Sequence, residues 1–443
     1  MRMIPAVLCL VLMGAGGSRG ELIDAARNQD REALRALLVK KANVSASAPD
    51  GTTALHWASY HDDGDSADLL IRAGANVNAA TDLGVTPLWL AAENSSVGMT
   101  ARLLEAGANP NAALLAGETP LMTAARTGNP EVTSLLLTKG ANVNARAARG
   151  QTALMWAVAQ KHDSVVKALL AGGADLHARS EAWSQMMAVP PHGHPANNRR
   201  IPHGGGTALL FAARVGDLAS AKLLVAAGAN VNDADAWGVS ATVLAAHSGY
   251  REIVEFLLHN GADPNAAAAG FAALHVAIMR RDERMAIALL NRGSDPNTPL
   301  RVWTPTRRSS NDFHFPPALV GATPFWLAAR FHMAEVMRLL AKRGADPQFV
   351  HRADYIVGDS MQRRSEETTA LMAATGIGGA KAWVPAETGG QEARALEAVK
   401  LAIELGADVN ATNAKGQTAL DGAKSSGYHS VVKFLLSKGA RNR

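Results

Sequence analysis

A period of 33 residues constrains the fold of this chain more than any other feature of its sequence. A Gly-Ala pair begins at Gly74, Gly107, Gly140 and Gly173, so one signal recurs three times at the same interval of 33 residues. Recurrence at a fixed interval in this range predicts a solenoid, in which each unit packs on its neighbours. We therefore expect one stacked array over the 443 residues and not several separate globular domains.

The repeat that runs from Gly117 to Ala145 predicts two helices and a loop. Thr119 suits a helix N-cap, and Pro120 suits the first helical position, where its missing N–H is not needed. Apolar residues then fall on one helical face, and a Gly-Asn-Pro sequence at 128–130 ends that helix. A second apolar face leads to Gly140, which suits the left-handed position beyond a helix end. Since one helix pair cannot bury both apolar faces, each pair must stack on the next.

The first helix of each repeat is rich in alanine and the second helix is rich in leucine. Slim first helices and bulky second helices should curve the stack, with the first helices and the loops on the concave side. The first helix opens with a four-residue box, which reads TALH at 53–56, TPLW at 86–89, TPLM at 119–122, TALM at 152–155, TALL at 207–210, TPFW at 323–326, TALM at 369–372 and TALD at 418–421. Weaker copies are SATV at 240–243 and AALH at 272–275.

This box resembles the Thr-Pro-Leu-His box that opens the first helix of the ankyrin repeat, and its copies cover nearly the whole chain after about residue 21. The resemblance implies an all-α fold, an ankyrin-type solenoid of stacked helix-turn-helix repeats joined by hairpin-like loops. In that family the histidine of the box makes structural hydrogen bonds, which implies this role for His56 and His275. Trp89 and Trp326, at the same box position, are expected in the core. Ankyrin arrays are generally binding modules, so the resemblance implies protein interaction and supplies no catalytic residue.

Three long insertions interrupt the loops between repeats, and a fourth falls between the two helices of one repeat. Longer intervals between closing glycines place them near 178–204, 298–320, 348–367 and 376–391. We count about eleven repeats in an array over residues 21–443, whose first repeat is atypical and fits a terminal cap. Insertions in repeat proteins commonly gather on the binding face. The alternative is tolerated surface elaboration, because long loops cost little free energy.

Residues 1–20 have the layout of a secretory signal peptide. Arg2 precedes an apolar run from Ile4 to Met13, and small residues follow up to Gly20. This run is too short to span a bilayer, and no other segment is apolar enough to do so. The only cysteine, Cys9, lies inside the run, which is compatible with an oxidising compartment. We expect an exported protein, periplasmic or secreted; the alternative is a frayed N-terminal tail.

Histidines in the first insertion are the candidate metal ligands. His192, His194 and His203 could hold zinc or copper. Their spacing matches no known metal motif, and the surrounding Pro, Gly and Asn residues favour a solvated loop, so we expect no metal and no cofactor. The sequence 376–379, GIGG, lacks the third glycine of a phosphate-binding loop and is interpreted as a flexible turn. With no HExxH, Walker A or Cys/His cluster in the sequence, we expect no enzymatic activity.

The expected concave groove carries the best evidence on function. Residues that follow the alanines of each first helix should face it, and the loop tips add others. The candidate partner-binding residues at these positions are Tyr60, His61, Arg126, Arg149, Arg214, Trp237, His247, Arg280, Arg330 and Phe331. The second insertion adds Trp303, Arg307, Arg308 and Phe313. Aromatics mixed with arginines are typical of interface hot spots, although these aromatics could instead pin the loop to the stack.

A mixed basic and aromatic groove suits a protein partner with acidic patches, and a solvated positive face is the alternative. The net charge of +5 is slight for this length and does not indicate a nucleic acid partner. We expect a monomeric, exported scaffold that mediates protein–protein interaction through its concave groove and enlarged loops. The alternative is a metal- or small-ligand-binding site, or an enzymatic site, built on the inserted loops.

Overall fold

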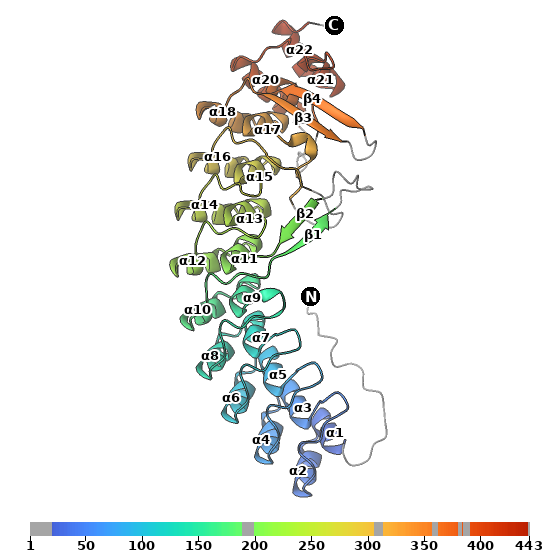
Figure 1. The fold of residues 1–443 in the computed structure, drawn as a ribbon, viewed down its shortest axis with the longest axis vertical. Helices are drawn as coiled ribbons and strands as arrows, with labels where there is room; N and C mark the ends of the chain where they lie inside the picture. The colour runs from blue at the N-terminus through green and yellow to red at the C-terminus, as the bar shows by residue number, and fades with distance from the viewer. Residues whose placement is uncertain are drawn as a thin grey trace. The chain divides into compact units, whose positions relative to one another are not determined.

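The computed structural model of this chain describes residues 20–187, 199–304, 313–356, 362–379, 383 and 390–441. These residues form eleven helix pairs and two short antiparallel hairpins. The chain divides into two compact units, residues 1–178 and residues 179–443. Within each unit the pairs stack in chain order (Figure 1). The predicted fold, a helical solenoid of stacked helix-turn-helix repeats, is confirmed.

The first unit contains five helix pairs, each made of an inner helix and an outer helix of nine residues. A tight turn joins the two helices of a pair, and a hairpin-like loop, here called a finger, joins each pair to the next. The pairs are α1 (Glu21–Arg27) with α2 (Arg31–Val39), α3 (Ala54–Tyr60) with α4 (Gly64–Arg72), α5 (Pro87–Glu93) with α6 (Val97–Glu105), α7 (Pro120–Thr127) with α8 (Pro130–Thr138), and α9 (Ala153–Ala159) with α10 (Asp163–Ala171).

The second unit contains six pairs and both hairpins. The pairs are α11 (Ala208–Val215) with α12 (Leu218–Ala226), α13 (Ala241–Ser248) with α14 (Arg251–His259), α15 (Ala273–Met279) with α16 (Glu283–Asn291), α17 (Pro324–Arg330) with α18 (Ala334–Lys342), α19 (Ala370–Ala374) with α20 (Gln391–Glu404), and α21 (Ala419–Ser425) with α22 (His429–Ser437). The hairpins are β1 (Trp183–Met187) with β2 (Arg199–His203), and β3 (Val350–Ile356) with β4 (Arg363–Thr369). Both project from the side of the inner helices (Figure 1).

The ends of the helices follow the capping residues of each repeat. The hydroxyl of Thr119 accepts a hydrogen bond from the backbone N–H of Met122, and Pro120 occupies the first helical position, as predicted. The closing glycine Gly140 has a φ of 85°, the left-handed conformation that ends an outer helix. In the first repeat Lys41 stands at this position with a φ of 58°, so the atypical repeat keeps the same backbone.

The histidines of the box join neighbouring repeats. The Nδ1 atom of His56 accepts from the backbone N–H of Thr53 (3.1 Å), which leaves its Nε2–H to donate to the carbonyl oxygen of Val85 in the next repeat (2.9 Å). His275 repeats this arrangement with Ala272 and Thr298. Because both ring nitrogens are used while the ring is neutral, the side chains are structural, as the resemblance implied.

Asparagine side chains make a second, regular connection between repeats. The amide of Asn78 donates to the carbonyl oxygen of Gly107 (3.1 Å), and its oxygen accepts from the backbone N–H of Asn109 (2.7 Å). We call this pair of hydrogen bonds the asparagine bridge. It recurs at Asn111, Asn144, Asn232, Asn265, Asn297 and Asn410. At these seven positions the bridge fixes the finger against the closing turn of the next repeat.

Parts of two insertions are ordered as hairpins, which the sequence analysis did not predict. Trp183 pairs with His203 across the first hairpin, so the expectation of a solvated loop is wrong for residues 183–187 and 199–203. Cross-strand polar contacts stabilise the second hairpin: Arg352 Nε donates to Glu367 (2.9 Å), and the Tyr355 hydroxyl donates to Glu366 (2.8 Å).

Acidification is expected to destabilise the second unit, because His275 is held neutral in the folded chain. Burial lowers the pKa of His275 from 6.5 to about 4, so the unfolded chain binds a proton at a higher pH than the folded chain does. The contribution of His275 to the free energy of unfolding is therefore fully present above about pH 6.5. It falls as the pH drops toward 4, by at most about 3 kcal/mol.

Urea unfolding of the wild type, His275→Asn and His259→Asn between pH 7.5 and 4.5 measures this effect. His259 is exposed at the end of α14, so its variant serves as the matched control. The wild type and the control should lose stability more steeply than His275→Asn. Equal slopes for all three proteins would contradict the assignment.

Candidate functional site

An exposed aromatic group lies at the end of an inner helix in the first unit. Tyr60, the last residue of α3, is 44% exposed, and its ring meets that of Trp57 edge to face at 5.7 Å. His61 stacks on Trp57 at 5.8 Å and donates from Nε2 to the carbonyl oxygen of Arg27 (2.9 Å). The predicted residues Tyr60 and His61 are thus brought together, with His61 held in place by the preceding repeat.

Two leucines at finger tips add apolar surface to the same unit. Leu83 is 47% exposed and Leu115 is 78% exposed. The backbone N–H of Leu115 donates to the carbonyl oxygen of Leu83 (3.2 Å), so the two tips are joined edge to edge. Exposed leucines on ordered loops are unusual enough to mark a contact surface when they adjoin one another. The sequence analysis did not select Leu115, although it lies at the finger tip, beside the tip glycine Gly117.

The arginines predicted in this unit differ in their surroundings. Arg126, at the end of α7, forms ion pairs with Glu93 and with Glu118 (3.7 Å to the latter). Its charge is therefore largely neutralised within the protein, and it is a weaker candidate for an acidic partner than the sequence indicated. Arg149 is exposed at a finger tip, in the left-handed conformation (φ 60°).

In the second unit the insertions fold back onto the inner helices and build an aromatic cluster. Phe313 of the second insertion packs against the rings of His247 (4.2 Å) and Phe271 (4.8 Å), while Phe315 contacts Phe271 (4.8 Å) and Trp383 (5.0 Å). Phe313 is only 8% exposed and Phe315 is fully buried. Of the two alternatives for this insertion, the structure supports the one in which its aromatics pin the loop. Phe313 is therefore not a surface contact.

The fourth insertion adds Trp383 to this aromatic cluster. Its backbone N–H donates to the carbonyl oxygen of Met279 (2.9 Å), and its indole N–H donates to that of His314. The side chain of Trp383 lies edge to face against His247 at 5.3 Å. Trp237, a predicted residue at a finger tip, meets Phe271 and is half-buried. Sequence reasoning missed Trp383 because no repeat position predicts it.

Several predicted groove residues of the second unit are used by the protein itself. Arg280 donates to the carbonyl oxygen of His247 (2.7 Å), and Arg330 donates to that of Gly378 (3.2 Å). Phe331 is only 3% exposed, so its prediction as a groove contact is wrong: the residue after the inner helix turns inward here. Arg214 is exposed.

Some of the remaining candidate residues lie outside the part of the chain that the structure describes, and the others lie within it. Arg307, Arg308, His192 and His194 lie outside the described residues. His203 lies on β2 and stacks on Trp183, with ring centroids 4.5 Å apart. Trp303 is half-buried. In the described part of the chain, no three His, Cys, Asp or Glu side chains gather as metal ligands would.

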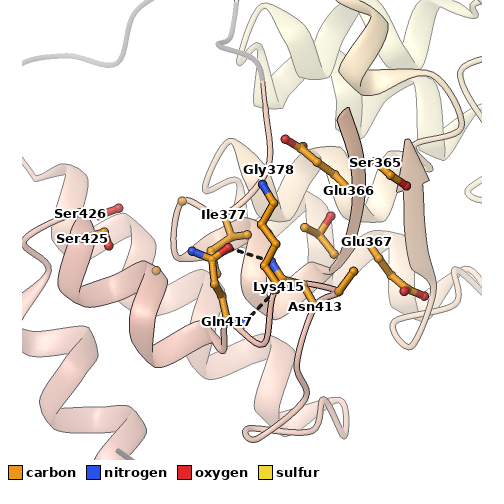
Figure 2. Close-up of a pocket in the computed structure, with 14 residues that line it drawn as sticks. Ser365, Glu366, Glu367, Ile377, Gly378, Asn413, Lys415, Gln417, Ser425 and Ser426 are labelled. Carbon is orange, nitrogen blue, oxygen red and sulfur yellow. Dashed lines mark hydrogen bonds between the residues drawn. The ribbon is translucent and has the colours of Figure 1, made fainter. Parts of the chain in front are cut away.

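A hollow of about 400 Å³ lies between the β3–β4 hairpin, the turn after α19 and the last finger. Lys415 extends from that finger between the hairpin and Ile377 (Figure 2). Three hydrogen bonds between Asn413 and Gln417 (2.9, 3.0 and 3.0 Å) hold the finger in its conformation. The described lining holds no histidine or cysteine, and its chemistry is that of hydrogen bonds and charge.

The GIGG sequence forms one wall of this hollow. A Cβ on Gly376 would lie 2.5 Å from the Ser426 hydroxyl, and one on Gly379 would lie 2.8 Å from the Cβ of Ala318. Close packing therefore accounts for these two glycines, which lie in a turn as predicted; the flexibility of that turn stays a prediction.

Comparison with known families agrees with this architecture. A model of three ankyrin repeats matches residues 22–113, 103–180, 187–268 and 209–300, and a model of many ankyrin repeats matches residues 392–436. The chain belongs to the ankyrin-repeat family. Ankyrin repeats generally mediate protein–protein interaction, and their members are typically scaffolds without enzymatic activity.

Nothing in the described portion of this ankyrin array forms a helix that is both long enough and apolar enough to cross a bilayer. Residues 1–19 of the predicted signal peptide lie outside that portion.

Truncation of Phe315 should cost the second ankyrin unit about 3–5 kcal/mol of unfolding free energy, because the ring is fully buried between repeat and insertion. Thermal and urea unfolding of Phe315→Ala measure the loss. Leu436→Ala, on the outer helix α22 and 42% exposed, is the matched control and should change stability by no more than about 0.5 kcal/mol. A Phe315→Ala protein as stable as the control would mean that the insertion is not packed as described.

Proposed function

We propose that this chain is an exported ankyrin-repeat scaffold that binds another protein through the inner face of its first unit. One observation carries the proposal: Tyr60, Leu83 and Leu115 expose large apolar side chains on the inner helices and fingers of that unit. In the second unit, by contrast, Phe331 at a predicted groove position and Phe313 of the second insertion are buried. The first unit therefore offers the more accessible apolar face.

The chemistry of this face defines the expected partner. Tyrosine is among the residues that contribute most to protein interfaces, and the exposed leucines at the finger tips of the same unit offer apolar contact area. Arg149, at a finger tip of the same unit, adds an exposed cation at the edge. We infer a protein partner whose contact segment combines apolar side chains with a carboxylate at its rim.

The enlarged loops offer a second contact surface, in the second unit. Met186 on β1 is 54% exposed and Trp183 is 38% exposed. An ordered hairpin holds such side chains at lower entropic cost than a loose loop would, which favours binding. The hairpin therefore supports the part of the proposal in which insertions contribute to recognition.

Export is proposed from the N-terminal sequence alone, where a basic residue, an apolar run and small residues follow one another in residues 1–20. If the chain is exported, the protein recovered from the periplasm or medium should begin near residue 21. N-terminal sequencing of the native protein measures this, with whole-cell lysate as the comparison. A protein that begins at Met1 and stays with the cytoplasmic fraction would refute export without affecting the binding proposal.

Substitution of the apolar inner face should weaken partner binding at least tenfold, because hot-spot residues each contribute about 1.4 kcal/mol or more. The partner is first captured by crosslinking to the wild-type chain in its native compartment. Its affinity for Tyr60→Ala and Leu115→Ser is then compared with that for the wild type by calorimetry.

Val39→Ser is the matched control for this experiment. Val39 is 83% exposed and apolar like Leu115, but it lies on the outer helix α2. The control should bind as the wild type does. Equal affinity of Leu115→Ser, Tyr60→Ala and the control would exclude the inner face of the first unit as the binding surface.

A further inference from the structure

Arg281 occupies an unusual position in the second unit. It lies in the turn between α15 and α16, in the left-handed conformation (φ 56°), and its guanidinium carbon is 5.9 Å from the ring centroid of Phe331. Its half-buried side chain forms no ion pair with any described carboxylate, and its buried Nε has no described hydrogen-bond partner. A cation that is partly removed from water in this way carries a desolvation cost.

Two further arginines lie near Arg281. Arg330, the last residue of α17, precedes Phe331 in the chain, and Arg394 lies in the first turn of α20. The three charges act on one another: Arg394 opposes the charge of Arg281, and Arg281 opposes that of Arg330. Burial is the larger cause in each case, and together with this repulsion it lowers the pKa of both Arg281 and Arg330.

Further titratable groups surround the arginines. His332 is buried and neutral. Burial lowers its pKa to about 4, and the three arginines act in the same direction, while its hydrogen bond to the carbonyl oxygen of Ala374 acts against them. The charge of Arg394 acts on Glu283, but burial and the neighbouring carboxylate of Glu335 outweigh it and raise the pKa of the Glu283 carboxyl. Glu366 attracts Arg330 but is itself bonded to the hydroxyl of Tyr355 and the backbone N–H of Gly379.

Tyr428 completes the cluster from the N-cap of α22. Its hydroxyl oxygen accepts a hydrogen bond from the side-chain amide of Gln391 (2.8 Å), and its ring lies 6.1 Å from that of His332. Because the oxygen accepts this bond, the hydroxyl proton is directed elsewhere and can be donated. The turns of four successive repeats thus bring three guanidinium groups and one hydroxyl donor to the same place.

We propose that Arg281, Arg330, Arg394 and Tyr428 form a binding site for an oxyanion, a carboxylate or phosphate group. Guanidinium groups present paired N–H donors that match both groups, and a bound anion would relieve the repulsion among the arginines. Every one of these residues lies in the second unit, and none belongs to the apolar face proposed above. The site and the proposed function can therefore fail independently.

The test measures thermal unfolding of the full chain in three solutions of equal ionic strength. These contain sodium chloride, sodium phosphate, or an acetylated and amidated triglutamate peptide with its sodium counter-ions. Phosphate or the peptide should raise the melting temperature of the wild type by about 2 °C or more over chloride, with saturation. The probe that does so identifies whether the natural ligand carries phosphate or carboxylate.

Arg281→Gln should abolish this rise. It should not lower the melting temperature in chloride, because it removes a repulsive charge without breaking an ion pair. A purely structural arginine would instead destabilise the protein when it is replaced. Arg284→Gln, an exposed arginine on the outer helix α16, removes the same charge and should keep the wild-type response.

Arg281→Lys provides a second variant if the glutamine variant folds poorly. It keeps the charge but loses the paired donors, so its response to the effective probe should be weaker than that of the wild type. The proposal is overturned if neither probe exceeds chloride for the wild type. It is also overturned if the foldable Arg281 variant responds as fully as Arg284→Gln.

Discussion

The asparagine bridge is the interaction on which the regularity of both stacks depends. At seven fingers one asparagine side chain bonds a carbonyl oxygen and a backbone N–H of the next repeat, and these bonds fix the spacing of the repeats that they join. The bridge from Asn297 reaches Gly344 (2.8 Å) across the second insertion, although the two residues lie 47 apart in the sequence. The stack therefore keeps its geometry when the chain between two repeats is lengthened.

The insertions of the second unit show what that freedom allows. The second places Phe315 on Phe271, and the fourth places Trp383 beside Phe315, so side chains of the protein itself cover part of the inner face. Burial of these rings stabilises the unit and removes the same surface from any partner. The first unit has no such insertion within its described residues, and its apolar inner residues stay exposed. One repeat type thus yields two different inner faces.

The sequence predicted the structural features that recur in every repeat. It did not predict the features of the insertions, which lie outside the period. The helix pairs, the cap at Thr119, the left-handed glycines and the role of His56 follow from rules that act within one repeat or between neighbours. The strands β3 and β4 were missed because RRSEETT shows no alternation of apolar and polar residues; cross-strand charge pairs stabilise them instead. Trp383 lies in a segment without period, so nothing in the sequence indicated its contacts.

The period also predicts ion pairs between neighbouring repeats. Residues one period apart lie side by side, so Glu93 and Arg126, which are 33 apart, form an ion pair that could have been predicted. By the same rule, the preceding repeat offers no carboxylate as an ion-pair partner for Arg281. The residue 33 positions before it is Ser248, in the preceding inner helix. The third arginine of that cluster arises from the fourth insertion, because α20 has 14 residues where α16 and α18 have nine, and Arg394 lies in the added N-terminal turns. The period thus pairs opposite charges at Glu93 and Arg126 in the first unit, whereas the arginines of the second unit come together where the chain departs from the period.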